Sequence, residues 1–314
     1  MKHVIPFVCK PGDAEAGDWL EALRRSMPDE NVELLAALDT EARAMCTVAI
    51  VANPLPEDLR TLPRLRWVHS VWAGVERLVN DLPDAAFDIV RLVDPMLADT
   101  MAEAVLAWTL FLHRDMPQYA RQQADRQWHA LAYRRAQETT VGLLGLGALG
   151  EASARRLVDA GFKVCGWSRH ARSLPDVKTH SGLEALPDVL RMSNILVCLL
   201  PLTAETRGLL DAAMLAHLPV GASLINFARG PIVDDVALRD ALDTSHIRHA
   251  VLDVFDVEPL PSQRWEWAHP NVTVLPHISA PTDRETASSI VAAHIRRYRE
   301  DGTIPPCVDR ARGY

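Results

Sequence analysis

The chain has 314 residues, enough for two domains that each bury a core of their own. Its composition, 48% apolar and 24% charged, is that of an ordinary globular protein, and its formal charge of −8 argues against nucleic acid or a membrane surface as a partner. Five scattered cysteines, without a CxxC pair or a Cys/His cluster, predict a reducing, cytoplasmic environment and no bound metal.

Short apolar runs near the N-terminus predict three strands. They are "HVIPFV", "CTVAIVA" and "RLRWVHSV", with helical or loop material between them. The first run is too short for a signal peptide and is interrupted by Lys10, so we interpret it as a strand.

A long helix is predicted next, in "TMAEAVLAWTLFLHRDM". It begins with a capping box from Thr100 to Glu103. The longest apolar run of the chain, Ala104 to Leu112, lies in this helix and is too short to span a bilayer. The pattern of the sequence changes near residue 100, which predicts a domain boundary there.

Six β-rich apolar runs follow the helix, most of them separated by segments with helical periodicity at 149–160, 183–191 and 234–243. Runs that are apolar on both faces and are joined by helices indicate a parallel sheet covered on both sides. The runs are "TTVGLLGLG", "FKVCGW", "NILVCLL", "ASLINFA", "HAVLDVF" and "VTVLPH". From Thr282 to about Glu300 the pattern is helical again, so a second boundary is expected near 282. The fold class is therefore α/β and doubly wound.

A glycine-rich loop follows the first of these six strands and opens a helix. Gly145, Gly147 and Gly150 form a G-x-G-x-x-G pattern. The first glycine allows a tight turn, the second allows close approach of a pyrophosphate, and the third allows close packing of helix and strand. The alternative is a plain glycine-rich turn. The predicted context favours a dinucleotide site formed by Gly145, Leu146, Gly147, Ala148, Leu149 and Gly150.

The end of the next strand indicates which dinucleotide is bound. An acidic residue there would hold the ribose hydroxyls of NAD, but the segment carries Ser168, Arg169 and Arg172 instead. Guanidinium groups pair with phosphate oxygens, so we expect NADP to be preferred and NAD to be possible. The alternative is an exposed basic loop without a ligand.

Three ionisable residues follow later strands of the same sheet: Arg229, Glu258 and His277. Ligands of doubly wound sheets bind beyond the carboxyl ends of the strands, so the three side chains could converge. Taken singly, each has an ordinary explanation: a surface arginine, a turn glutamate before a proline, and a capped histidine.

The motifs around these residues resemble a known enzyme family. "FARGPIVDDVAL", "LDVFDVEPLP" and "TVLPHISAPT", in this order after "VGLLGLGALG", are similar to the D-isomer-specific 2-hydroxyacid dehydrogenase family over nearly the whole chain. Within the family the likeness is greatest to the glyoxylate/hydroxypyruvate reductase A branch, whose members carry segments like "WSR" and the terminal "VDRARGY".

The resemblance implies that the chain reduces small 2-keto acids, such as glyoxylate and hydroxypyruvate, to 2-hydroxy acids. His277, as an imidazolium, would protonate the keto oxygen while hydride reaches C2. Glu258 would raise the pKa of His277. Arg229 would hold the carboxylate and the keto oxygen. Further nucleotide contacts are expected from Leu200, Pro201, Ala228 and Asp253.

The resemblance also implies how the substrate is held and how the chain is divided. Backbone amides of the loop Trp72, Ala73, Gly74 and Val75 would bind the substrate carboxylate. Residues 1–99 with 283–314 would form a substrate domain, and residues 100–282 a Rossmann nucleotide domain, with a hinged cleft between them. The segment at about 100–138 would be an arm that forms a homodimer, unless its helix packs only within its own subunit.

Two other functions remain open from the sequence. The side-chain pocket could select another 2-keto acid, such as pyruvate or phenylpyruvate. The chain could instead be a nucleotide-sensing binding protein, but such a protein would not need the set of Arg229, Glu258 and His277. The complete set favours an enzyme.

Overall fold

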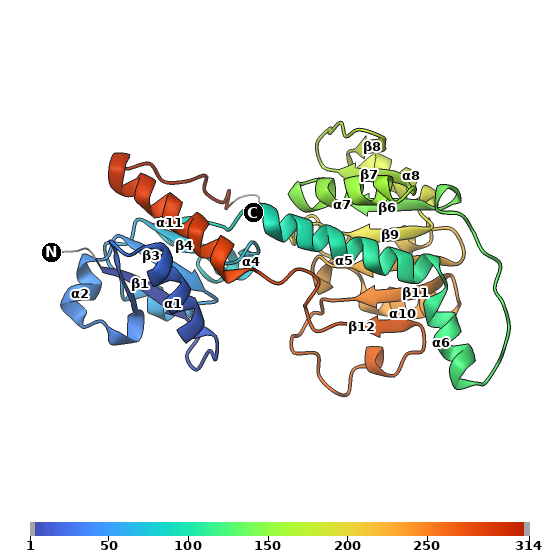
Figure 1. The fold of residues 1–314 in the computed structure, drawn as a ribbon, viewed down its shortest axis with the longest axis horizontal. Coiled ribbons are helices and arrows are strands. Elements are labelled where there is room, and N and C mark those ends of the chain that lie inside the picture. The colour runs from blue at the N-terminus through green and yellow to red at the C-terminus, as the bar shows by residue number, and fades with distance from the viewer. Residues whose placement is uncertain (1–3, 311–314) are drawn as a thin grey trace. The chain divides into compact units, whose positions relative to one another are not determined.

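The computed structural model describes residues 4–310 and divides the chain into two compact units (Figure 1). The terminal unit comprises the chain up to Met96 together with the chain from Thr282 onward, and the central unit is Leu97–Pro281. The assignment of substrate to the former and of nucleotide to the latter stays a prediction, as does the hinge.

The terminal unit is built on a five-stranded parallel sheet with the order β2-β1-β3-β4-β5. Its core lies on both faces of the sheet: α1 and α11 cover one face, and α3 and α4 cover the other. The strands are β1 (Val4–Cys9), β2 (Asn31–Leu34), β3 (Val48–Ala52), β4 (Trp67–Ser70) and β5 (Asp88–Val90). The helices are α1 (Ala16–Ser26), α2 (Thr40–Met45), α3 (Pro56–Arg60), α4 (Glu76–Asp81) and α11 (Arg284–Asp301).

The central unit is built on a seven-stranded parallel sheet with the order β12-β11-β10-β9-β6-β7-β8. The helices α5 and α7 pack on one face, and α8, α9 and α10 on the other. The strands are β6 (Thr140–Leu144), β7 (Lys163–Ser168), β8 (Val177–Ser181), β9 (Ile195–Cys198), β10 (Ala222–Asn226), β11 (Ile247–Leu252) and β12 (Val272–Val274). The helices are α5 (Pro95–His113), α6 (Met116–Ala124), α7 (Ala148–Asp159), α8 (Leu186–Met192), α9 (Ala212–Leu215) and α10 (Asp235–Asp243). The predicted doubly wound α/β class is confirmed.

The strand order of the central unit reverses between β6 and β9. The helix after β6, α7, packs on one face of the sheet, whereas the helix after β9, α9, packs on the other. The two loops therefore diverge at the carboxyl ends of their strands. Ligands of open α/β sheets bind in the crevice that such a reversal leaves. The fold thus places a ligand site at this edge of the sheet.

Three strands differ from the sequence analysis, which expected helical or loop material or no element at these places. They are β2, β5 and β8, and each lies at an edge of its sheet. Edge strands are covered less completely than central ones, and their burial is mixed along their length. They therefore lack the continuous apolar run that marks a buried parallel strand.

The long helix begins earlier than the predicted capping box. It starts at Pro95, and Thr100 lies inside it. Proline suits the first helical position, and the carboxylate of Asp94 accepts the N–H of Met96 at 2.9 Å, which satisfies one of the free amides at the helix start. Among the described residues, this helix meets the length and hydropathy of a membrane span, but Val105 and other side chains of its buried face pack into the core of the central unit.

The chain after α6 runs in an extended loop along the central unit back to β6 (Figure 1). This loop carries Trp128 and Tyr133, two large side chains that are largely exposed. Exposed aromatic surface of this kind is typical of contact between subunits. The homodimer formed by residues 100–138 stays a prediction, which the mass of the protein in solution tests.

Close backbone packing fixes the glycine loop between β6 and α7. A Cβ atom on Gly150 would lie 1.8 Å from the carbonyl oxygen of Gly145, a distance that no rotamer change relieves because the oxygen belongs to the backbone and the backbone also fixes the position of Cβ. Gly147 is different: a Cβ there would meet nothing within 4 Å, and its φ of −75° suits any residue.

We predict that Gly150→Ala lowers the free energy of unfolding by about 3 kcal/mol, as for an overpacked core. Gly147→Ala is the matched control and changes it by less than about 1 kcal/mol. Urea denaturation of both variants measures the difference. Equal stability of the two variants would show that the Gly145–Gly150 contact does not hold the loop.

Candidate active site

His277 and Glu258 form a hydrogen-bonded pair at the carboxyl edge of the central sheet. His277 follows β12, and its Nδ1 lies 2.8 Å from Oε2 of Glu258. The other carboxylate oxygen, Oε1, accepts the N–H of Phe255 at 2.9 Å, so the carboxylate is fixed at both ends. Because Nδ1 faces an acceptor, it carries hydrogen and Nε2 is left for another partner. The imidazole is about half exposed, so an external molecule can reach it.

The pair favours the charged form of both side chains. The hydrogen bond to Glu258 raises the pKa of His277 above its ordinary value of 6.5, against the opposing effects of burial and of the Arg229 charge. Burial raises the pKa of Glu258, but the hydrogen bonds from His277 and from the Phe255 N–H outweigh burial and leave that pKa below its ordinary value. The site therefore holds an imidazolium beside a carboxylate to a higher pH than a free histidine would.

Asp253 fixes the turn that carries His277. It follows β11 and is 2% exposed. Its Oδ1 accepts the N–H of Ile278 at 2.7 Å, and its Oδ2 accepts the N–H of Ser279 at 2.9 Å. His277 has a φ of +56°, in the left-handed region that non-glycine residues rarely adopt, so the turn needs such support. The expected nucleotide contact of Asp253 stays a prediction.

Arg229 is positioned by a buried asparagine that the sequence analysis missed. Asn226, the last residue of β10, is 1% exposed. Its Oδ1 accepts the N–H of Ala228 at 3.2 Å, and its Nδ2 donates to the carbonyl oxygen of Arg229 at 3.2 Å. The sequence carried one signal for this role, a polar amide at the end of an otherwise apolar strand.

The loop of Arg229 packs directly on the loop of Glu258. A Cβ atom on Gly230 would lie 2.2 Å from the carbonyl carbon of Phe255, so glycine is required for this contact. The contact joins Gly230, the residue after Arg229, to Phe255, which lies three residues before Glu258. This contact explains the glycine that follows the arginine, and it ties the Arg229 loop to the His277–Glu258 pair.

The glycine loop leaves the start of α7 open. Gly145 has a φ of +102°, and its N–H donates to the carbonyl oxygen of Trp167 at 2.9 Å. Gly147 precedes the helix and is exposed, as is Ala148. The first amides of a helix attract phosphate groups, and a Cβ atom added to Gly147 would meet no atom of the described residues within 4 Å. The side chain of Leu146 is buried in the core, so it can contribute to a nucleotide site only through its backbone.

The remaining predicted nucleotide residues surround this loop in the central unit. Leu149 lies in the first turn of α7 and is half-buried, and Leu200 and Pro201 follow β9 at the point where the strand order reverses. Ala228 follows β10 and is 4% exposed. Their contacts with a nucleotide stay predictions.

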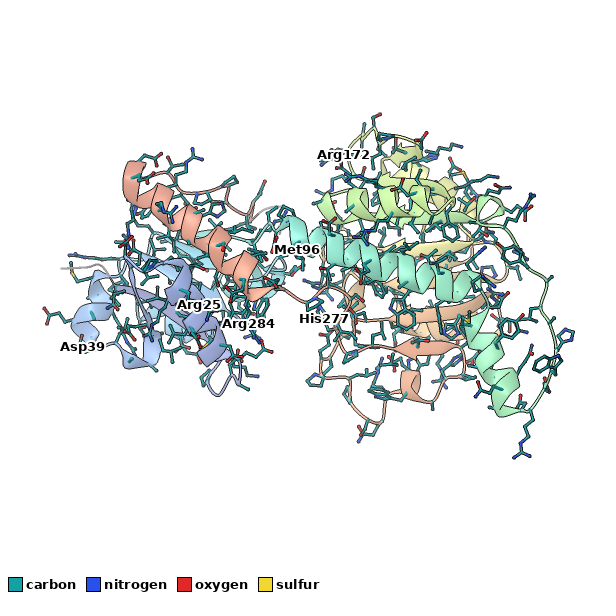
Figure 2. All side chains as sticks on the ribbon, viewed as in Figure 1. Arg25, Asp39, Met96, Arg172, His277 and Arg284 are labelled. Atoms are coloured by element: carbon teal, nitrogen blue, oxygen red, sulfur yellow. The ribbon has the colours of Figure 1, made fainter. Side chains whose placement is uncertain are left out.

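The basic loop after β7 is organised by contacts to its own backbone and to a neighbouring loop. The hydroxyl of Ser168 donates to the carbonyl oxygen of His170 at 2.7 Å. Arg169 forms an ion pair with Glu205, which belongs to the loop after β9. Arg172 is exposed, and it lies with His277 on the side to which the strands of the central unit point (Figure 2). The loop itself contains no acid, and its partner Glu205 was not predicted because it comes from the loop of another strand.

In the terminal unit, the loop after β4 presents unpaired amides. The N–H of Trp72 donates to Oγ of Ser70 at 3.0 Å, but no acceptor within residues 4–310 pairs with the N–H groups of Ala73, Gly74 and Val75. The indole of Trp72 packs edge-on against Trp19, with ring centroids 5.4 Å apart. The free donors are therefore at 73–75, and Trp72 contributes packing.

The part of the chain that the structure describes holds no group of three or more His, Cys, Asp or Glu side chains placed to bind a metal ion.

Comparisons with known proteins show the family to which the chain belongs. A family model described as "D-isomer specific 2-hydroxyacid dehydrogenase, NAD binding domain" matches residues 106–279. The chain is 34% identical over 307 residues to the glyoxylate/hydroxypyruvate reductase A of Yersinia enterocolitica, covering 96% of this chain and 97% of that protein.

Two solved structures are similar over nearly the whole chain. A D-isomer specific 2-hydroxyacid dehydrogenase from Xanthobacter autotrophicus Py2, in complex with NADPH and MES, is 41% identical with a TM-score of 0.91, covering 98% of this chain and 99% of that one. The NADPH-dependent glyoxylate/hydroxypyruvate reductase of Sinorhizobium meliloti, in complex with NADP and sulfate, is 31% identical with a TM-score of 0.91, covering 100% of both chains.

Proposed function

The chain belongs to the D-isomer specific 2-hydroxyacid dehydrogenase family, and we propose that it reduces glyoxylate and hydroxypyruvate with NADPH. The observation that carries the proposal is the His277–Glu258 pair beside the loop of Arg229, at the same sheet edge as the open glycine loop. The full-length similarity to reductases of these two acids supports the choice of substrates.

His277 is the proton donor of the proposed reaction. When bound, the reduced nicotinamide supplies the hydride that is added to C2 of the keto acid. The C=O double bond becomes a single bond, and the oxygen receives a proton from Nε2 of His277, which becomes neutral. Glu258 holds Nδ1–H and thereby keeps the ring oriented and charged until transfer. A general acid must be protonated, so the raised pKa of His277 extends the pH range of reduction upward.

Arg229 is the proposed clamp for the substrate. Nη1 of its guanidinium group donates to the carbonyl oxygen of Ala228 at 2.6 Å. The planar group carries five N–H donors in all, and two parallel donors of such a group match the carboxylate and the adjacent keto oxygen of a 2-keto acid. Donors that are already in place stabilise the negative charge that develops on the oxygen. Asn226 and Gly230 hold the backbone of this residue, so the orientation of the clamp is set by the fold.

The free amides at 73–75 are the proposed second anchor of the substrate carboxylate. Successive backbone N–H groups bind anions without adding a lysine or arginine side chain, which suits a protein with a formal charge of −8. No side-chain pairing competes for these donors within the described residues.

Arg169 and Arg172 are the proposed contacts for the 2′-phosphate of NADPH. They follow β7, the strand next to the glycine loop, where NAD-specific relatives of the fold carry an acid. Binding would require Arg169 to share its charge between Glu205 and the phosphate.

The double variant Arg169→Ala with Arg172→Ala should weaken NADPH binding by about 10-fold to about 100-fold and NADH binding by much less, because NADH lacks the phosphate. Fluorescence titration with each nucleotide measures both constants. Arg191→Ala removes an exposed arginine of α8 and serves as the control. Equal losses for the two nucleotides would reject the assignment.

The proposed activity is tested by following NADPH absorbance with glyoxylate, hydroxypyruvate, pyruvate and phenylpyruvate, each repeated with NADH. We expect fast turnover of the first two acids with NADPH. His277→Ala should reduce turnover by about 100-fold or more and leave NADPH binding unchanged, because the side chain donates a proton and does not hold the nucleotide.

Other outcomes of this assay separate the alternatives. Turnover of pyruvate or phenylpyruvate alone would keep the mechanism and reject the substrates. Tight NADPH binding without turnover of any acid would instead support a nucleotide-sensing binding protein.

A further inference from the structure

The side chain of Arg310, near the C-terminus, bridges two distant backbone carbonyl groups of the terminal unit. Its Nη1 donates to the carbonyl oxygen of Leu82 at 2.6 Å, and its Nη2 donates to that of Phe87 at 2.6 Å. The guanidinium carbon lies 5.9 Å from the centre of the Phe87 ring, within the range of a cation–π contact. One side chain thus hydrogen-bonds the backbone at both ends of the connection between α4 and β5.

The residues before Arg310 attach the C-terminal segment to the edge of the sheet. The N–H of Val308 donates to the carbonyl oxygen of Ile89 in β5, the edge strand, at 2.8 Å. The Val308 side chain is 9% exposed and shares a core cluster with Val75, Leu78 and other residues under α4. We call residues 308–310 the C-terminal strap. The strap therefore contacts both α4 and β5.

These two elements also support the loop with the free amides. At its start, the carbonyl oxygen of Trp72 accepts the N–H of Leu92, two residues after β5, at 3.1 Å. At its end, Val75 is the residue that caps the start of α4, and it is buried. The loop at 72–75 is therefore attached at one end to the segment after β5 and at the other end to α4, and Arg310 connects these two elements.

The helix α4 needs such external support. It has six residues, far fewer than an isolated helix requires in water. Carbonyl groups in the last turn of a helix lack partners within the helix. Arg310 supplies a charged donor at Leu82, the residue that ends α4. If this donor were lost, the first turn of α4 would also be less well fixed, and Val75 lies at that turn.

We infer that Arg310 is a positioning residue for substrate binding: the C-terminal strap holds α4 and β5 so that the amides of Ala73, Gly74 and Val75 face the carboxylate of the keto acid. The inference rests on the proposed carboxylate-binding role of this loop. Arginine is required because two fixed donors of one planar group reach two carbonyls at once, whereas a lysine ammonium is a single flexible point charge.

The terminal unit contains a matched control for this grip. Arg43 of α2 also bridges two backbone carbonyls: its Nε donates to Leu38 at 2.9 Å and its Nη2 to Leu35 at 2.9 Å. Both arginines thus use two donors of one guanidinium group, but the carbonyls that Arg43 binds lie between β2 and α2, outside the loop at 72–75 and its two supports. Arg310→Lys and Arg43→Lys therefore remove the same kind of contact at two places.

The experiment compares these two variants in the full-length protein. Hydrogen–deuterium exchange of peptides covering residues 72–82 should be faster in Arg310→Lys and unchanged in Arg43→Lys. The KM for glyoxylate should rise about tenfold in Arg310→Lys with kcat changed less than about twofold, because the carboxylate contact is equally present in ground and transition states. The Kd for NADPH should stay the same in both variants. Arg310→Ala should increase the exchange rate at 72–82 and the KM for glyoxylate more than Arg310→Lys does.

Each contrary result has a definite meaning. Unchanged exchange at 72–82 in Arg310→Lys, or an equal rise in KM in both lysine variants, would overturn the inference. Faster exchange in Arg310→Lys with an unchanged KM would show that the strap holds the loop, but it would overturn the link between the strap and substrate binding. A wild-type protein that reduces no keto acid would reject the proposed function, and the exchange comparison would still decide whether Arg310 holds the loop.

Discussion

The contact on which the site depends is the hydrogen bond between His277 and Glu258, which is maintained by backbone packing around it. A histidine at a positive φ and a carboxylate on an irregular loop would not stay paired by themselves. Asp253 accepts two amides of the histidine turn, and Gly230 brings the arginine loop against the loop of the carboxylate. The strands thus bring three loops to one edge of the sheet, and a few buried polar contacts hold these loops in a fixed arrangement around the His277–Glu258 hydrogen bond.

The same kind of support recurs at three parts of the molecule for which we propose a ligand role. Asn226 fixes the backbone of Arg229, Asp253 fixes the turn of His277, and Arg310 fixes the supports of the amides at 73–75. In each case a side chain hydrogen-bonds the backbone of a loop with a proposed ligand role, or of the elements that support such a loop. The proposed reactive and anion-binding groups lie on loops because ligands bind at the strand ends. The hydrogen bonds from these side chains to the backbone provide the rigidity that catalysis and anion binding require.

Local sequence patterns predicted much of the fold. Gly145 and Gly150 answer local backbone demands, a positive φ and a close backbone contact, whereas Gly147 answers neither. Arg229 and His277 were noticed because each follows an apolar strand, but their roles came from the family resemblance. Partners from distant segments could not be predicted: Glu205 meets Arg169 from another loop, and Arg310 reaches Leu82 across 228 positions of sequence. The edge strands β2, β5 and β8 were missed because they are only partly buried. The start of the long helix was placed too late because Asp94 and Pro95 form an earlier cap than Thr100 does.

The most direct test of the account is the pH dependence of kcat/KM for glyoxylate reduction in the wild type and in Glu258→Gln. In the proposed mechanism the rate requires protonated His277, and Glu258 raises the pKa of that group, so kcat/KM of the wild type should decline only as the pH rises through a pKa above 6.5. Glutamine can still hydrogen-bond the ring but carries no charge, so the decline should move to lower pH in the variant. If kcat/KM declined at the same pH in both proteins, this would contradict the claim that Glu258 raises the pKa of the proton donor, His277.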